Sequence, residues 1–103
     1  MHKVRIVVVC GSGVAMAMHA AYKLREYLEN EKLYVHIDGS GNNELPGRIN
    51  NYDMVVSNAQ VTVDTDKPIF SAIPLITGIG EKELVEKIIA KVKEIQEEKN
   101  NKE

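Results

Sequence analysis

The stretch "VVVCGSGVAMAMHAA" holds the residues whose types and spacing best suit covalent chemistry in this chain. An apolar, β-branched run leads into Cys10, the single cysteine, and Gly11 and Gly13 follow it before small residues recur at helical spacing. A thiol between a strand and a helix N-terminus is surrounded by backbone N–H groups and by about half a positive charge from the helix dipole. Because this environment stabilises a thiolate and binds anions, the pattern predicts a nucleophilic cysteine that handles phosphate.

Other glycine-rich loops fit this stretch less well. A Walker-type nucleotide loop ends in Gly-Lys-Ser/Thr, and no lysine lies between Cys10 and His19. A dinucleotide-binding loop needs a third glycine where this chain has Met16, and a thiol redox pair needs a second cysteine. The sequence therefore predicts no cofactor. An inert, buried cysteine, followed by two glycines that form a tight turn, remains the alternative to any chemistry at this position.

A cysteine-dependent phosphatase is a further alternative. Its loop resembles Cys-x5-Arg-Ser/Thr, in which the arginine clamps the phosphate, and counting from Cys10 places Met16 at the arginine position. Asp64 and Asp66 are loop acids, but neither stands at an offset that marks a general acid. A loop that keeps the thiol and lacks the clamp suits a carrier that passes phosphate onward better than an enzyme that hydrolyses it.

Two further pairs of residues are candidates near the thiol. Ser57 and Asn58 end a predicted strand at the same edge of the sheet, where they either donate hydrogen bonds to phosphate or simply form a turn. Met16 and Met18 either offer a soft apolar surface to a partner or pack in the core from their helix, and core packing is the favoured interpretation for Met18.

The elements that must position these residues alternate between strands and helices. The first strand, "VRIVVV", is too apolar for a strand with one solvated face and is typical of the inside of a parallel sheet. The expected strands cover residues 4–9, 33–37, 52–57 and 69–76, and the expected helices cover 14–30, weakly 44–50, and a final stretch whose apolar stripe runs over 84–95. We expect "DGSGNNELPG" to form a loop, and Pro74 to place the last strand at an edge or to break it.

This order predicts a single α/β domain. About four parallel strands would form a sheet with helices on both faces, a three-layer sandwich. Ligands of such sheets bind beyond the carboxyl ends of the strands, where Cys10, Ser57 and the "TGIG" turn all fall. We expect the domain to span residues 1–98 and residues 99–103 to form a disordered tail.

Composition excludes several classes of function. The chain has 103 residues, 44% of them hydrophobic, which suits one globular domain. A net charge of −2 and the absence of tryptophan and of any basic stripe argue against nucleic acid as a partner. With scattered histidines and one cysteine we expect no metal site, and with no leader or long apolar run we expect a cytoplasmic protein that does not insert into a membrane.

The segment "IVVVCGSGVAMAM" resembles the active loop of the enzyme IIB components of the bacterial sugar phosphotransferase system, in particular the galactitol-type branch, whose loop reads Cys-Gly-x-Gly-Val-Ala-Thr-Ser. "DMVVSNAQV" and "IPLITGIGEKELVEKI" resemble later segments of that branch. The resemblance covers residues 3–95 and implies the lactose/cellobiose IIB-like fold.

The resemblance also implies a function. Enzyme IIB accepts a phosphoryl group on cysteine from a histidine of enzyme IIA and delivers it to a sugar or polyol held by the membrane enzyme IIC, so Cys10 would be the phosphoryl carrier. The residues that would surround the phosphate are Gly11, Ser12, Gly13, Val14, Ala15, Met16 and Ala17.

Three departures from the family pattern leave an alternative open. Met16 and Ala17 replace a Thr-Ser pair, and Gln60 stands where the family tends to have arginine. Each lost hydrogen bond to a charged group costs about 1.5–3 kcal/mol, so transfer would be slower, although the backbone N–H groups remain. The alternative is a binding or regulatory module that keeps the fold and has lost transfer.

Overall fold

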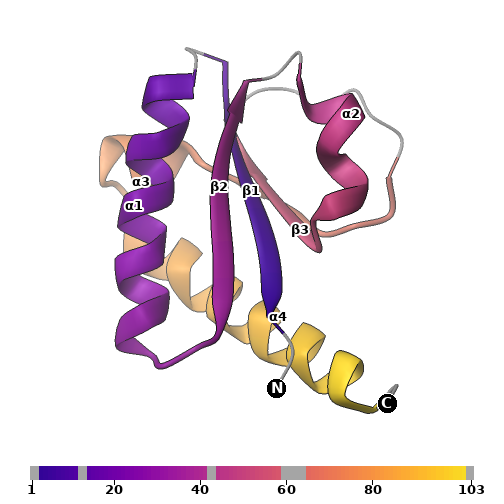
Figure 1. Ribbon diagram of the computed structural model, residues 1–103. Helices are drawn as coiled ribbons and strands as arrows, with labels where there is room; N and C mark the ends of the chain where they lie inside the picture. Colours follow the sequence, from indigo (N-terminus) through magenta and orange to yellow (C-terminus); the bar gives the residue numbers. More distant parts are fainter. Residues whose placement is uncertain (1–2, 12–13, 42–43, 59–64, 102–103) are drawn as a thin grey trace.

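A four-stranded, all-parallel sheet forms the centre of the molecule, in the strand order β2-β1-β3-β4 (Figure 1). The computed structural model describes residues 3–11, 14–41, 44–58 and 65–101. The strands are β1 (Val4–Cys10), β2 (Val35–Gly41), β3 (Met54–Ser57) and β4 (Ile69–Ser71). The predicted parallel sheet of about four strands is confirmed.

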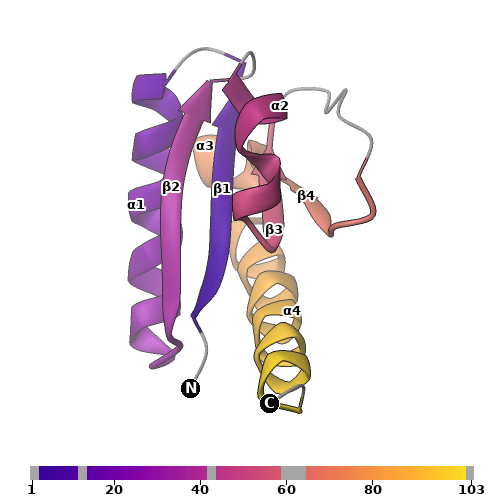
Figure 2. The same ribbon diagram turned by 45° about the vertical axis from the view of Figure 1, so that its right-hand side comes forward.

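Helices cover both faces of the sheet, so the predicted three-layer arrangement is also confirmed (Figures 1 and 2). On one face lie α1 (Val14–Asn30), α3 (Ile73–Thr77) and α4 (Glu81–Asn101). On the other lie α2 (Leu45–Arg48) and the short 3₁₀ helix η2 (Ile49–Asn51).

The central strand β1 is buried on both of its faces. Ile6 and Val8 belong to the larger core beneath α1 and α4, whereas Val7 and Val9 belong to the smaller core beneath α2. All four are 0% exposed, which accounts for the unbroken β-branched run. Arg5, near the start of the strand, is exposed.

The two long helices bury the stripes that their periodicity predicts. Leu24 and Leu28 of α1 and Ile88 and Val92 of α4 are all 0% exposed and pack in the same core. Because these side chains recur every three or four residues, each helix places one apolar face on the sheet and carries its charged residues on the remaining surface.

The second strand differs from its prediction. β2 begins at Val35 and continues through Gly41, so the loop expected from residue 38 is wrong for its first four residues. Gly39, Ser40 and Gly41 pair with the last residues of β1, because β1 is seven residues long and its pairing partner extends with it. Pairing at long range thus overrides the turn-forming composition of this segment.

The fourth strand is shorter than predicted. β4 ends at Ser71, and the residues that follow form α3 instead of extended chain. Pro74 lies in the first turn of α3, where its missing N–H costs no helical hydrogen bond. The expectation that this proline accompanies an edge strand or breaks it is confirmed.

The last helix runs to Asn101 and therefore includes residues 99–101, which the sequence assigns to a tail. Lys99 anchors this end, since its Nζ lies 2.7 Å from Asp53 Oδ2 and donates to the Lys3 carbonyl oxygen at 3.1 Å. The end of α4 consequently lies beside the beginning of β1.

A polar cluster joins α1, α3 and α4. Lys23 Nζ lies 2.6 Å from Glu81 Oε1 and donates to the Leu75 carbonyl oxygen at 2.9 Å, and the Tyr27 hydroxyl donates to Glu81 Oε2. The Lys23 ammonium, followed by the Tyr27 hydroxyl, lowers the pKa of the Glu81 carboxyl below its ordinary value.

The lowered pKa of Glu81 predicts a contribution to stability that depends on pH. A carboxyl whose pKa falls on folding stabilises the protein above its ordinary pKa of 4.5 and loses this contribution as pH falls below that value. Glu81→Gln should therefore lower the free energy of unfolding at neutral pH, and the difference from wild type should shrink in acid. Urea unfolding across pH measures it. A difference as large in acid as at neutral pH would contradict the assignment, and Glu86→Gln, at an exposed position of the same helix, is the control.

Gly39 allows α1 to lie close to β2, and its substitution should be costly. A Cβ at this position would lie 2.9 Å from Met18 Sδ, 3.0 Å from Met18 N and 3.2 Å from Ala17 C, two of which are backbone atoms. We expect Gly39→Ala to destabilise the fold by about 1–3 kcal/mol, measured by thermal or urea unfolding. Gly47→Ala is the matched control, because nothing lies within 4 Å of the added methyl group. Equal stability of the two variants would refute the close approach.

Candidate functional site

Cys10 is the last residue of β1 and lies where the carboxyl ends of the strands meet. It pairs with Gly41 of β2, and α1 begins four residues later at Val14. The alternation of side chains along β1 places it on the same face as Ile6 and Val8, beneath α1. The residue is 1% exposed, so the thiol is covered in this state.

The predicted second loop meets the first. The Gly11 N–H donates to Asn58 Oδ1 at 2.7 Å, and the Asn58 N–H donates to the Val9 carbonyl oxygen at 3.1 Å. Asn58 thus joins the end of β3 to the residue after the thiol. It acts through its side-chain oxygen on a backbone amide, which differs from the predicted role of a donor.

Ser57 lies one residue earlier and is buried. It pairs with Val9 in the sheet, and its carbonyl oxygen accepts a hydrogen bond from the Ala72 N–H at 2.9 Å. Ser57 therefore links β3 to the segment between β4 and α3 and lies at the same edge of the sheet as Cys10.

Part of the predicted phosphate loop lies outside the described residues, namely Ser12 and Gly13, as does Gln60 of the later loop. Val14, Ala15, Met16 and Ala17 form the first turn of α1, whose four backbone N–H groups have no partner within the helix. This turn provides donors and the positive end of the helix dipole close to the thiol in sequence.

Three side chains near the start of α1 differ in exposure. Ala17 is fully buried against the sheet, whereas Met16 and Met18 are each 39% exposed. The favoured interpretation of Met18 as a core residue is therefore wrong. Its position follows from Gly39, which leaves room for the Met18 thioether over the surface of β2.

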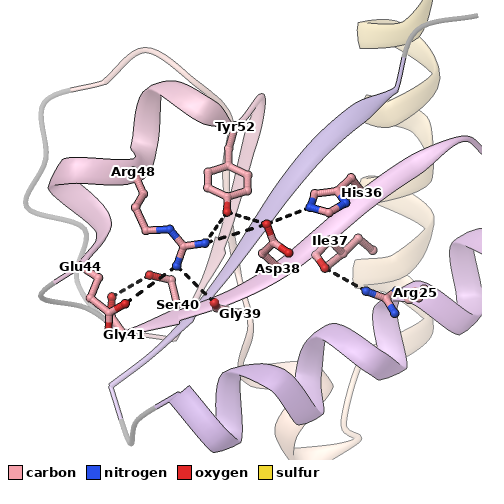
Figure 3. Close-up of polar contacts among 10 residues, drawn as sticks. All are labelled: Arg25, His36, Ile37, Asp38, Gly39, Ser40, Gly41, Glu44, Arg48 and Tyr52. Carbon is pink, nitrogen blue, oxygen red and sulfur yellow. Dashed lines mark hydrogen bonds and ion pairs between the residues drawn. The ribbon is translucent and has the colours of Figure 1, made fainter.

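Sequence reasoning missed a network of polar side chains on the α2 face of β2 (Figure 3). The Tyr52 hydroxyl donates to Asp38 Oδ2 at 2.7 Å, Arg48 Nη2 donates to the Tyr52 hydroxyl at 2.6 Å, and His36 Nε2 lies 2.9 Å from Asp38 Oδ2. A signal was present, since His36, Asp38 and Ser40 alternate along the strand. It could be seen only once β2 was known to extend past residue 37.

The hydrogen bonds of this network join α2 to β2, and they shift the pKa values of Asp38 and Tyr52. Burial raises the pKa of the Asp38 carboxyl, but the hydrogen bonds from Tyr52 and His36 outweigh it, so the pKa lies below its ordinary value. Burial, followed by the hydrogen bond to Asp38, raises the pKa of Tyr52. Asp38 therefore stays ionised at neutral pH and accepts both hydrogen bonds.

Comparison with known proteins identifies the family. The profile of the lactose/cellobiose-specific IIB subunits of the phosphotransferase system matches residues 5–94. This chain belongs to that enzyme IIB family. It is therefore a phosphotransferase component, and its role is phosphoryl transfer in a sugar phosphotransferase system. Enzyme IIB components in general work with enzyme IIA and enzyme IIC partners.

Two relatives from Escherichia coli (strain K12) support this assignment. The galactitol-specific EIIB component is 30% identical over 88 residues, which cover 84% of this chain and 94% of the relative. SgcB, named as a candidate phosphotransferase enzyme IIB component, is 29% identical over 86 residues, with the same coverage of 84% and 94%. The recognition of an enzyme IIB component is thus confirmed, and one of these relatives is of the galactitol type.

A solved structure confirms the fold. The lactose-specific IIB component domain from Streptococcus pneumoniae superposes with a TM-score of 0.55 at 10% identity, covering 93% of this chain and 97% of that chain. Among the described residues of the present chain, no helix combines the length and the apolar character that a membrane span requires.

The bond between Gly11 and Asn58 predicts the effect of removing its acceptor. Asn58→Ala should lower the free energy of unfolding by about 0.5–1.5 kcal/mol and should speed hydrogen exchange at the Gly11 amide, because that N–H loses its partner. Asn58→Asp keeps an acceptor oxygen in the same place and should retain most of the protection. Amide exchange followed by NMR measures both variants. Unchanged protection at Gly11 in Asn58→Ala would show that the bond does not hold the loop.

Proposed function

We propose that this enzyme IIB component carries its phosphoryl group on Cys10, taking it from enzyme IIA and passing it to a sugar or polyol bound by the membrane enzyme IIC. The observation that carries the proposal is the place of Cys10, at the carboxyl end of the central strand and directly before the loop that leads into α1. The galactitol-type relative favours the galactitol-type branch.

Transfer would proceed through two displacements at phosphorus. The Cys10 thiolate attacks the phosphorus of the phosphohistidine on enzyme IIA, and an S–P bond forms as the P–N bond breaks. A hydroxyl group of the sugar then attacks, an O–P bond forms as the S–P bond breaks, and the hydroxyl proton is released. The thiolate returns as the leaving group, so the protein is ready for another cycle.

The phosphate would be held mainly by backbone groups. The N–H groups of the first turn of α1 and the positive end of its dipole favour a doubly charged anion at this position. Ala17 is buried and carries no donor, and Met16 carries none either. The Gly11 N–H already donates to Asn58 Oδ1. Asn58 would therefore shape the loop, and the backbone amides at the start of α1 would bind the phosphate.

The surface around the site suits contact with protein partners. Met16 is 39% exposed beside the loop, and Ile73, which begins α3 at the same edge of the sheet, is 53% exposed. Apolar side chains at the carboxyl ends of the strands would allow enzyme IIA and enzyme IIC to dock in turn over one thiol. The relay would act in the cytoplasm, without inserting into the membrane and without binding nucleic acid.

A second candidate is a binding or regulatory module with the same fold. The 1% exposure of Cys10 and the missing hydroxyl groups at Met16 and Ala17 favour it. Phosphatase activity has less support, because Met16 occupies the position where a phosphatase loop carries arginine. A folded protein that takes no phosphoryl group from enzyme IIA would favour the module, and turnover of an aryl phosphate would favour the phosphatase.

Incubation with phosphorylated enzyme IIA tests the proposal directly. We expect intact-protein mass spectrometry to show one added phosphoryl group, and peptide mapping to place it on Cys10. Cys10→Ser should abolish the adduct, because the thiolate nucleophile is gone, while the melting temperature reports that the variant still folds. A phosphoryl adduct of the same mass on Cys10→Ser would contradict the assignment of Cys10 as the carrier residue.

A further inference from the structure

The strand β2 lies at one edge of the sheet, and its backbone groups divide into two sets. The Val4 N–H of β1 donates to the Tyr34 carbonyl oxygen at 3.2 Å, so residue 34 turns its polar groups toward β1. Because successive residues of a strand turn their polar groups to opposite sides, 36, 38 and 40 also face β1. The groups of Val35, Ile37, Gly39 and Gly41 therefore point away from the sheet.

Three successive outward carbonyl groups of this edge accept hydrogen bonds from side chains (Figure 3). Arg25 Nη2 of α1 donates to the Ile37 carbonyl oxygen at 3.0 Å. Arg48 Nη1 of α2 lies 3.5 Å from the Gly39 carbonyl oxygen, and the Ser40 hydroxyl donates to the Gly41 carbonyl oxygen at 3.1 Å. The two arginines come from helices on opposite faces of the sheet and meet at its edge.

Both guanidinium groups are held in place by other contacts. Arg48 Nη2 donates to the Tyr52 hydroxyl at 2.6 Å, and a carboxylate oxygen of Glu44 lies 3.9 Å from its Nη1. The Arg25 guanidinium lies 5.6 Å from the centre of the Tyr22 ring. These contacts add to the hydrogen bonds that hold both arginines over the edge of the strand.

The opposite edge of the sheet, at β4, needs less protection against pairing with a strand of another molecule. β4 contains three residues, which is short for pairing with another strand, whereas β2 contains seven. A long open edge with unpaired carbonyl and N–H groups is a template for a strand of another molecule. Among the described strands, β2 is thus the edge strand that is more open to pairing with another chain.

We propose that Arg25, Arg48 and Ser40 close the edge of β2 against pairing with the same strand of a second copy of this chain. A second β2 would have to displace both arginines from the carbonyl groups before it could form its own hydrogen bonds. The closed edge thereby disfavours association of two copies through β2.

Replacement of both arginines by methionine tests the proposal. Arg25→Met with Arg48→Met keeps most of the alkyl stem over the strand and removes the donors. We expect the double variant to self-associate at least roughly tenfold more tightly than wild type, measured by light scattering over a concentration series. The outward amides of Val35, Ile37, Gly39 and Gly41 should become protected from hydrogen exchange as the dimer forms.

A charge-matched control separates edge opening from the change in net charge. Lys82→Met with Lys93→Met also removes two positive charges, but from exposed positions of α4. This control variant should self-associate no more than wild type. A folded double-arginine variant that remains monomeric would overturn the proposal, as would a dimer without protection of the four amides. If loss of the Arg48 bond to Tyr52 unfolds the double variant, Arg25→Met alone decides the question, and wild-type behaviour of that variant overturns it.

Discussion

The pairing of β1 with β2 on one side and with β3 on the other is the constraint on which the rest of the structure depends. It places β1 in the middle of the sheet, where the helices on the two sides bury both of its faces, and this explains its apolar sequence. The register places Cys10 beside Gly41 and Val9 beside Ser57, so the strands end together. Asn58, one residue beyond β3, can therefore accept the hydrogen bond of the Gly11 amide. The geometry around the thiol is a consequence of strand pairing.

Much of this architecture could be predicted from local patterns. Leu24, Leu28 and Ile88 recur at helical spacing, and the β-branched run of β1 indicates an inner strand, so the helices and the parallel sheet follow from the sequence. The extension of β2 could not be predicted in the same way. Glycine is typical of turns, but at position 39 its lack of a side chain allows α1 to lie close to β2.

Some residues of the candidate site could likewise be predicted from local patterns, and others could not. Cys10 and Asn58 could be singled out because each ends a strand or directly follows one, and the carboxyl ends of parallel strands share an edge. The network of Asp38, Tyr52 and Arg48 could not, because it joins residues from a strand, a helix and the segment that leads into β3. Side-chain pairs of this kind depend on register and helix placement, which composition and periodicity do not specify.

The contacts of Lys99 place the end of α4 beside the start of β1. Strands rise about 3.3 Å per residue, so the seven residues of β1 put roughly 20 Å between that end of the sheet and Cys10. A linker or a fused domain at either terminus would consequently emerge behind the thiol, on the side remote from any docked protein. The same adjacency would allow the two ends to be joined by a short peptide and the chain to be opened elsewhere, with the sheet unchanged.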